Sequence, residues 1–364
     1  MTSQYPEEPR QRDQWILTRR GGRNQLDPFK PHAFHVEEER SESGAIVSVA
    51  TIFLTNRECP WHCLMCDLWK NTLTETVPAG AILKQIDYAL SRMGGFGFVP
   101  PPKSGSAKKV RGNDGAVLPI KKIKLYNSGS FFDPQAIPPD EHEGIARRVA
   151  EFERVIVECH PALVGKSTLR FQELLRAAGG DRRTAPTKLE VAMGLETAHP
   201  EALKKLNKRM TPEQFRRAAE FLKRNGIALR VFVLVKPPFL SENEALNWAN
   251  RSVDFAFDCG ATAVSLIPTR FGNGALEALA QQGRFSPPEL ATLEAALDYG
   301  VGLKRGRAFA DLWDLEKFSE CGECFERRRA RLQEMNLGQT VLPRVVCARC
   351  GNKARGNRSS SGAL

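Results

Sequence analysis

The chain reads Val47-Ser48-Val49-Ala50-Thr51-Ile52-Phe53-Leu54 and then, after Thr55, Asn56-Arg57-Glu58-Cys59-Pro60-Trp61-His62-Cys63-Leu64-Met65-Cys66-Asp67. The apolar run predicts a buried strand, and the segment behind it predicts a loop with three cysteines at the spacing C-x3-C-x2-C. Three thiolates on one short loop can bind three corners of a [4Fe–4S] cluster. A fourth cysteine does not follow nearby, so one iron of such a cluster stays open to an outside ligand.

This cysteine spacing resembles that of the radical S-adenosylmethionine (SAM) enzymes. The resemblance implies that Cys59, Cys63 and Cys66 hold the cluster and that the amino and carboxylate groups of SAM chelate the open iron. It also implies that an electron from the cluster cleaves SAM to a 5′-deoxyadenosyl radical, which abstracts a substrate hydrogen. The residue before the third cysteine is usually aromatic in that family; here it is Met65, whose adaptable apolar side chain can lie against the adenine instead.

A zinc site is the alternative interpretation of the same loop. Zinc needs a fourth ligand, and His62 stands between the cysteines. However, neighbouring extended residues point to opposite sides, so His62 and Cys63 would not face the same ion. Three cysteines at this spacing after a strand favour an iron–sulfur cluster.

The composition of the whole chain narrows its class. With 364 residues, 41% of them hydrophobic, it is long enough for one large domain with appendages. We find no apolar run of membrane-spanning length and no signal peptide in the polar start Met1–Arg12, so we expect a cytoplasmic protein that does not insert into a membrane. Most of the nine cysteines are clustered, which in a reducing compartment indicates metal ligands.

The net charge is +11 and the pI is about 9.3. A basic balance of this size is compatible with binding RNA, but it is equally compatible with a soluble enzyme of alkaline pI.

From Val47 onward, short apolar runs alternate with helical patterns, which predicts a parallel sheet with helices outside it. Six or so such units fit an α/β fold, the partial (β/α)6 barrel that the resemblance implies, with its sites at the carboxyl ends of the strands. We expect four parts: an N-terminal extension at 1–45, the barrel at 46–310, a cysteine-rich module at 311–350 and a disordered tail at 351–364. A flexible insertion is predicted at 94–119.

Two strand ends carry candidate SAM ligands. The strand 122–126 is followed by Asn127, Ser128, Gly129 and Ser130, which look like the family's glycine-rich segment that binds the methionyl amino group. The usual Gly-Gly-Glu form is absent, so the polar roles would fall to the asparagine, the two serines and the backbone. An ordinary turn is the alternative interpretation.

The strand 189–193 is followed by Gly194-Leu195-Glu196-Thr197 and, further on, by Asn207-Lys208. These segments resemble the Elongator catalytic subunit and oxygen-independent coproporphyrinogen oxidase branches of the family. There, the residue matching Glu196 contacts the SAM ribose, and a cation matching Lys208 neutralises the SAM carboxylate. The alternative is a solvated surface helix. Other polar residues at strand ends are weaker candidates: Glu158, His160, Lys236, Thr269, Arg270 and Asn273.

Taken together, Ser128-Gly129-Ser130-Phe131, Gly194-Leu195-Glu196-Thr197, Asn207-Lys208 and Lys236-Pro237-Pro238-Phe239 resemble a narrower branch, the radical SAM proteins that form archaeosine in tRNA. This resemblance spans roughly 47–270. It implies modification of a nucleoside in tRNA and an electron donor such as ferredoxin or flavodoxin. A radical SAM enzyme acting on a protein or small metabolite, and a non-catalytic zinc-dependent RNA-binding protein, remain alternatives.

Four more cysteines form a second cluster near the C-terminus, Cys321-Gly322-Glu323-Cys324 and Cys347-Ala348-Arg349-Cys350. Two C-x2-C pairs make a tetrahedral thiolate site, which predicts a structural zinc ribbon. An auxiliary iron–sulfur cluster fits the same spacing. Between the pairs, the stretch 325–331 carries four arginines, which either contact phosphates or form the solvated face of a helix.

Overall fold

The computed structural model describes residues 4–93, 120–179 and 186–350, so the predicted insertion and tail lie outside the described residues. Eight strands form one sheet in chain order. The first pair is antiparallel and all later neighbours are parallel. The strands are β1 (Ala33–Arg40), β2 (Ile46–Phe53), β3 (Ile120–Tyr126), β4 (Arg154–Glu158), β5 (Lys188–Glu196), β6 (Ala228–Val235), β7 (Ala263–Pro268) and β8 (Arg307–Ala310).

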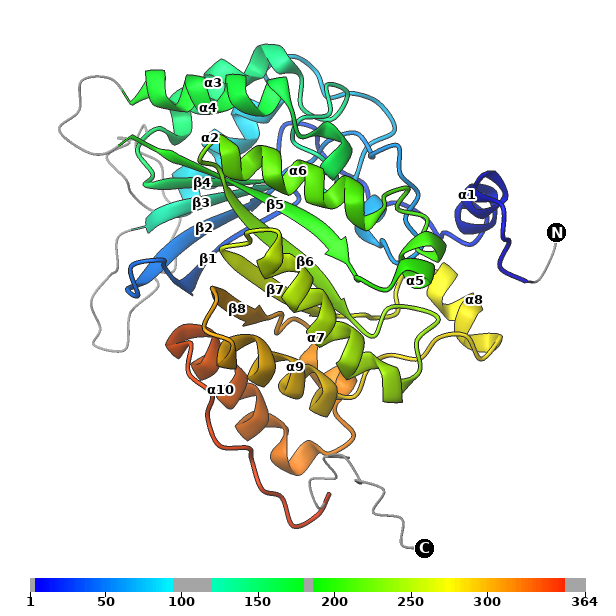
Figure 1. The fold of residues 1–364 in the computed structure, drawn as a ribbon. Helices are drawn as coiled ribbons and strands as arrows, with labels where there is room; N and C mark the ends of the chain where they lie inside the picture. The colour runs from blue at the N-terminus through cyan, green and yellow to red at the C-terminus, as the bar shows by residue number, and fades with distance from the viewer. Residues whose placement is uncertain (1–3, 94–119, 180–185, 351–364) are drawn as a thin grey trace, which may run out of the picture.

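The sheet is curled, and helices cover its convex face, so the predicted α/β partial barrel is confirmed (Figure 1). α1, α5 and α8 gather instead at the end toward which the parallel strands point (Figure 1). None of the described helices is long and apolar enough to cross a membrane. The helices are α1 (Pro9–Leu17), α2 (Ala81–Met93), α3 (His142–Val149), α4 (Lys166–Ala178), α5 (Pro200–Lys205), α6 (Pro212–Arg224), α7 (Glu242–Asp258), α8 (Ala275–Gln281), α9 (Leu290–Gly302) and α10 (Gly322–Gly338).

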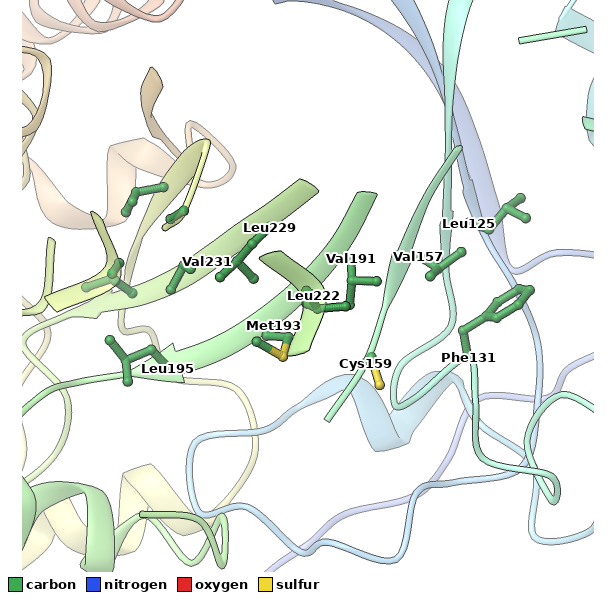
Figure 2. Packing of buried hydrophobic residues seen from close by; sticks show 14 of the residues in the cluster. Leu125, Phe131, Val157, Cys159, Val191, Met193, Leu195, Leu222, Leu229 and Val231 are labelled. Carbon is green, nitrogen blue, oxygen red and sulfur yellow. The ribbon is translucent and has the colours of Figure 1, made fainter. Parts of the chain in front are cut away.

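The convex face of the sheet is apolar because every second residue of each strand faces the helices. Leu125, Val157, Val191 and Val231 each come from a different strand and are fully buried. They belong to one large core cluster, part of which is seen from close by in Figure 2. This apolar alternation is the signal that made most of the parallel strands predictable from the sequence.

The concave face carries charge instead. In the amino-terminal halves of β3, β5 and β6, the residues that alternate with the apolar core residues are ionic. Five cations and four carboxylates meet at the amino-terminal half of the sheet, and we call this set the lumen charge network. Its members are Lys122, Lys124, Arg154, Arg230, Arg307, Glu37, Glu39, Glu42 and Glu190.

The network explains why β1 is not predicted from the sequence. β1 lies inside the segment 1–45 that we expect to be an extension, yet it pairs along its whole length with β2. Its inward residues Glu37 and Glu39 face cations of the network rather than an apolar core. The strand therefore lacks the apolar alternation by which strands are found.

Arg230 is the centre of the network. Its Nη2 lies 2.8 Å from Glu39 Oε1 and its Nε lies 2.8 Å from Glu190 Oε1, with all three side chains buried. Burial alone would raise the pKa of Glu39, but Arg230, Lys124 and Lys122 hold it well below its usual value. Because the folded pKa is depressed, this carboxylate stabilises the fold above the unfolded pKa of about 4.5, and the contribution is lost as the pH falls toward the folded pKa.

We predict that Glu190→Gln lowers the free energy of unfolding by about 3 kcal/mol, because Arg230 and Arg154 then lose a buried counter-charge. Urea denaturation at neutral pH measures this loss. The matched control is Glu143→Gln, which removes an exposed ion pair with Arg147 and should change stability by less than about 0.5 kcal/mol. Equal losses in the two variants would contradict a structural role for the network.

Candidate functional site

The cysteine loop follows β2 and is held by partners from distant parts of the chain. The buried Gln85 of α2 accepts from the backbone N–H of Thr55 and donates to its carbonyl, both at 2.8 Å. At the other end of the loop, the Asn273 side chain donates to the Leu64 carbonyl at 2.7 Å. The sequence marks Asn273 as a candidate substrate contact, but it is 3% exposed and positions the cysteine loop instead.

The three sulfurs of this loop do not all lie within 4.8 Å of one another. Around one tetrahedral zinc, with Zn–S bonds of about 2.3 Å, sulfurs lie about 3.8 Å apart. In the described chain, one set of three or more Cys, His, Asp or Glu side chains has all its ligand atoms within 4.8 Å, and Cys59, Cys63 and Cys66 do not belong to it. A wider spacing fits a cluster in which each thiolate binds a different iron. His62 Nδ1 lies 3.5 Å from Asp13 Oδ1.

The segment that follows β3 lies directly against the cysteine loop. A Cβ on Gly129 would come 3.0 Å from the Cβ of Cys59, so a larger residue there would press on the loop. Ser128 has a left-handed backbone, with φ of 49°. Asn127 is fully buried, and neither its amide nitrogen nor its amide oxygen has a hydrogen-bond partner. A buried, unpartnered carboxamide fits a site that holds a polar ligand.

Glu158, at the end of β4, holds this segment through its backbone. Its Oε2 accepts from the backbone N–H of Asn127 at 3.1 Å. Burial raises the pKa of Glu158 to about 7, although the backbone N–H groups of the segment and the charge of Lys208 act to lower it. His160 stacks on Trp61 of the cysteine loop, with ring centroids 3.9 Å apart and planes 11° apart.

Glu196 and Lys208 form a buried ion pair, with Nζ 2.6 Å from Oε1. A Cβ on Gly194 would overlap both charged groups, so a larger residue there would displace the pair from its present position. Burial raises the pKa of Cys63 to about 12, and Lys208 acts to lower it. The solvated-helix alternative for Lys208 does not match this burial.

Backbone strain is concentrated at this same edge of the sheet. Of the nine non-glycine residues with positive φ in the described chain, four lie at or just after the carboxyl ends of β3, β5 and β6, and two more follow α5. They are Ser128, Glu196, Asn207, Arg209, Lys236 and Phe239. Such conformations cost about 1–3 kcal/mol each and tend to cluster at functional sites. Lys236 itself donates to the Ser286 hydroxyl and pairs with Glu242, so it holds a neighbouring loop in place.

Residues 5–24, which we call the N-terminal strap, form a further part of this site, of which the sequence indicates only an attachment to the main body through residues 15–17. Trp15 and Ile16 pack against Leu64 and α8. Asp13 accepts from the Asn207 amide at 2.8 Å, and Arg20 pairs with Glu58 at 2.6 Å. In the sequence, the strap is marked by the apolar trio 15–17 in an otherwise polar segment.

The four C-terminal cysteines come together as predicted. All four sulfurs lie within 4.8 Å of one another, with Cys321–Cys347 at 3.9 Å and Cys324–Cys350 at 3.8 Å. This spacing fits one tetrahedral ion. Two of the nearby arginines are structural, because Arg328 and Arg331 pair with Glu294 and Asp298 of α9.

No protein-family model matches the chain. It is 25% identical over 350 residues to an uncharacterized protein of Methanocaldococcus jannaschii, which covers 90% of this chain and 86% of that protein. It is 26% identical over 257 residues to archaeosine synthase subunit beta of Methanosarcina acetivorans, covering 68% and 65% of the two chains. The subunit of the same name from Thermococcus kodakarensis is 30% identical over 151 residues, covering 40% and 43%. The chain thus spans less than two thirds of either archaeosine synthase subunit.

Among solved structures, similar folds include methylornithine synthase, with a TM-score of 0.47, 13% identity and coverage of 79% of this chain and 70% of that one. Another is Elp3 of Methanocaldococcus infernus lacking residues 1–46, with a TM-score of 0.43, 15% identity and coverage of 64% and 57%. In sequence, the chain is similar to archaeosine synthase subunit beta, as the other motifs predict.

We predict that Lys208→Met lowers the free energy of unfolding by about 3–5 kcal/mol, because Glu196 is left as a buried, unpaired charge. Adding Glu196→Gln in the same chain should restore most of the loss. Lys204→Met, which removes an exposed lysine of α5, is the matched control and should change stability by less than about 0.5 kcal/mol. Urea denaturation of the four proteins tests the pair, and no rescue in the double variant would argue against it.

Proposed function

We propose that the chain is a radical SAM enzyme whose cluster is held by Cys59, Cys63 and Cys66. The observation that carries the proposal is the meeting of three features at one strained edge of the sheet. They are the loop that carries Cys59, Cys63 and Cys66, the unpartnered carboxamide of Asn127 and the buried Glu196–Lys208 pair. When bound, the cluster supplies the electron that cleaves SAM to the radical that abstracts a substrate hydrogen.

The chain's own residues would bind and orient SAM. Asn127 has free donors and acceptors for the methionyl amino group, and Ser128 and Ser130 flank it. Lys208 supplies the positive charge for the carboxylate, and Glu196 supplies acceptors for the ribose hydroxyls. The N-terminal strap packs against Leu64 of the cysteine loop and would help to hold the loop in place.

The substrate we propose is a nucleoside in tRNA. Two relatives are named archaeosine synthase subunit beta, and the net charge of +11 favours contact with a polyanion. An electron donor such as ferredoxin or flavodoxin would complete the reaction. The barrel at 46–310 would act together with residues 1–45, since these supply β1 and the strap. The module at 311–350 would hold one Zn²⁺ on its four thiolates.

We predict that Cys63→Ala abolishes SAM cleavage, because two thiolates do not retain the cluster. Iron should fall from about four per chain to near zero after anaerobic purification, and 5′-deoxyadenosine should not form. The control is Cys259→Ala, which removes a buried cysteine at the end of α7 and should leave iron and cleavage unchanged. Cleavage retained in Cys63→Ala would refute the assignment.

A second prediction separates the two metal sites. Cys324→Ser should remove about one zinc per chain while leaving about four irons and sulfides on the first loop. The measurement is elemental analysis of protein purified without oxygen. About eight irons in the unaltered chain would instead assign an iron–sulfur cluster to the C-terminal thiolates. Zinc alone, even after anaerobic reconstitution, would overturn the radical proposal.

A further inference from the structure

Five aromatic rings from distant parts of the chain meet on the concave face of the sheet, and we call this set the aromatic wall. They are His35 of β1, Phe53 of β2, Tyr126 of β3, Phe232 of β6 and Trp313 behind β8. Trp313 lies 5.8 Å from both His35 and Phe53 between ring centroids. Phe53 to Tyr126 is 6.1 Å and Tyr126 to Phe232 is 6.0 Å.

The wall is accessible to solvent, unlike the apolar residues beside it. Phe53, Tyr126 and Phe232 each keep part of their surface exposed, whereas the residues just before the first two, Ile52 and Leu125, are fully buried on the other face. Trp313 is 57% exposed. A chain gains nothing in stability from leaving large aromatic faces in water, and such faces mark places where a partner binds.

The position of the wall ties it to the proposed SAM site. Tyr126 directly precedes Asn127, and Glu158 is close enough to influence the Tyr126 hydroxyl. Two residues of a strand span about 6.6 Å. Because Tyr126 is next to Asn127, a ring stacked on the wall lies within about one ring's length of the proposed SAM ligands. On its other side the wall borders the lumen charge network at Lys124. The wall therefore lies between the proposed SAM ligands and that network.

Polar groups stand at the rim of the wall. Arg270, which follows β7, pairs with Asp311, and Asp311 accepts from the Trp313 backbone N–H at 3.0 Å. Both side chains keep about a fifth to a quarter of their surface exposed, at 20% and 25%. A guanidinium and a carboxylate at the edge of an aromatic surface can hydrogen-bond the edge of a flat heterocycle.

We propose that the aromatic wall receives the substrate's flat ring as a nucleobase turned out of its RNA strand, with Trp313 as the outermost stacking surface. This inference rests on the proposed function. Aromatic side chains stack on any base, and enzymes that act on a base in a folded nucleic acid take it out of the stack. The net charge of +11 favours an RNA carrying that base over an uncharged aromatic ligand.

The test measures 5′-deoxyadenosine formed by the reconstituted full chain, with and without unfractionated tRNA from an archaeal strain lacking its archaeosine synthase subunit beta. Trp313→Ala should weaken the apparent affinity for this tRNA about tenfold or more, the effect of losing one base-stacking contact. Trp313→Phe should restore most of it. Iron content and the far-UV circular dichroism spectrum should match the unaltered chain, since Trp313 is exposed.

Trp248→Ala is the control, because Trp248 lies on α7 on the convex side and is not part of the wall. It should leave tRNA-dependent turnover unchanged. Trp313→Ala with unaltered tRNA affinity would overturn the proposal. An unaltered chain that cleaves SAM but does not respond to tRNA would also overturn it, while leaving the radical assignment in place. A chain that loads iron and never cleaves SAM would refute the proposed function itself.

Discussion

The buried ion pairs across the concave face are the interaction on which the shape of the protein depends. β1 and β8 are the two edge strands of the sheet, and in a flat sheet they would lie far apart. Arg307 of β8 joins them, since it lies 2.7 Å from Glu42 and donates to the Arg40 carbonyl at 3.1 Å. Arg230 adds a link from β6 to Glu39 of β1. These bonds require a curled sheet, because only curvature brings non-neighbouring strands within reach.

Curvature has a consequence for the site. In a flat parallel sheet, the ends of β2 and β5 would be separated by two strands and about 14 Å. In the curled sheet, the loop after β2 and the segment after β5 share a hydrogen bond, from the Leu64 backbone N–H to the Leu206 carbonyl at 2.9 Å. Lys208 then comes close enough to lower the pKa of Cys63, which burial raises. The concave face thus has two parts. Ion pairs set the curvature at the amino-terminal end of the strands, and strained backbone presents polar groups at the carboxyl end.

The N-terminal strap joins the pieces that meet at this edge. It contacts the cysteine loop through Glu58, the segment after α5 through Asn207, and α8 through Trp15. Gly274 shows how closely it packs, because any side chain there would overlap the Arg19 carbonyl. Residues 5–24 are therefore part of the site's architecture.

The sequence by itself determined the parallel strands, the helices between them and the two cysteine groups, because apolar periodicity and ligand spacing are local properties. It also singled out Asn127, Glu196 and Lys208, since each follows a strand end within a recognisable segment. It did not reveal β1, the contacts of the strap or the roles of Asn273 and Lys236. Their partners lie far away along the chain: Glu39 meets Arg230, and Asn273 meets Leu64. Only the tertiary structure decides such pairings, because the value of a charge or an amide depends on what burial places opposite it.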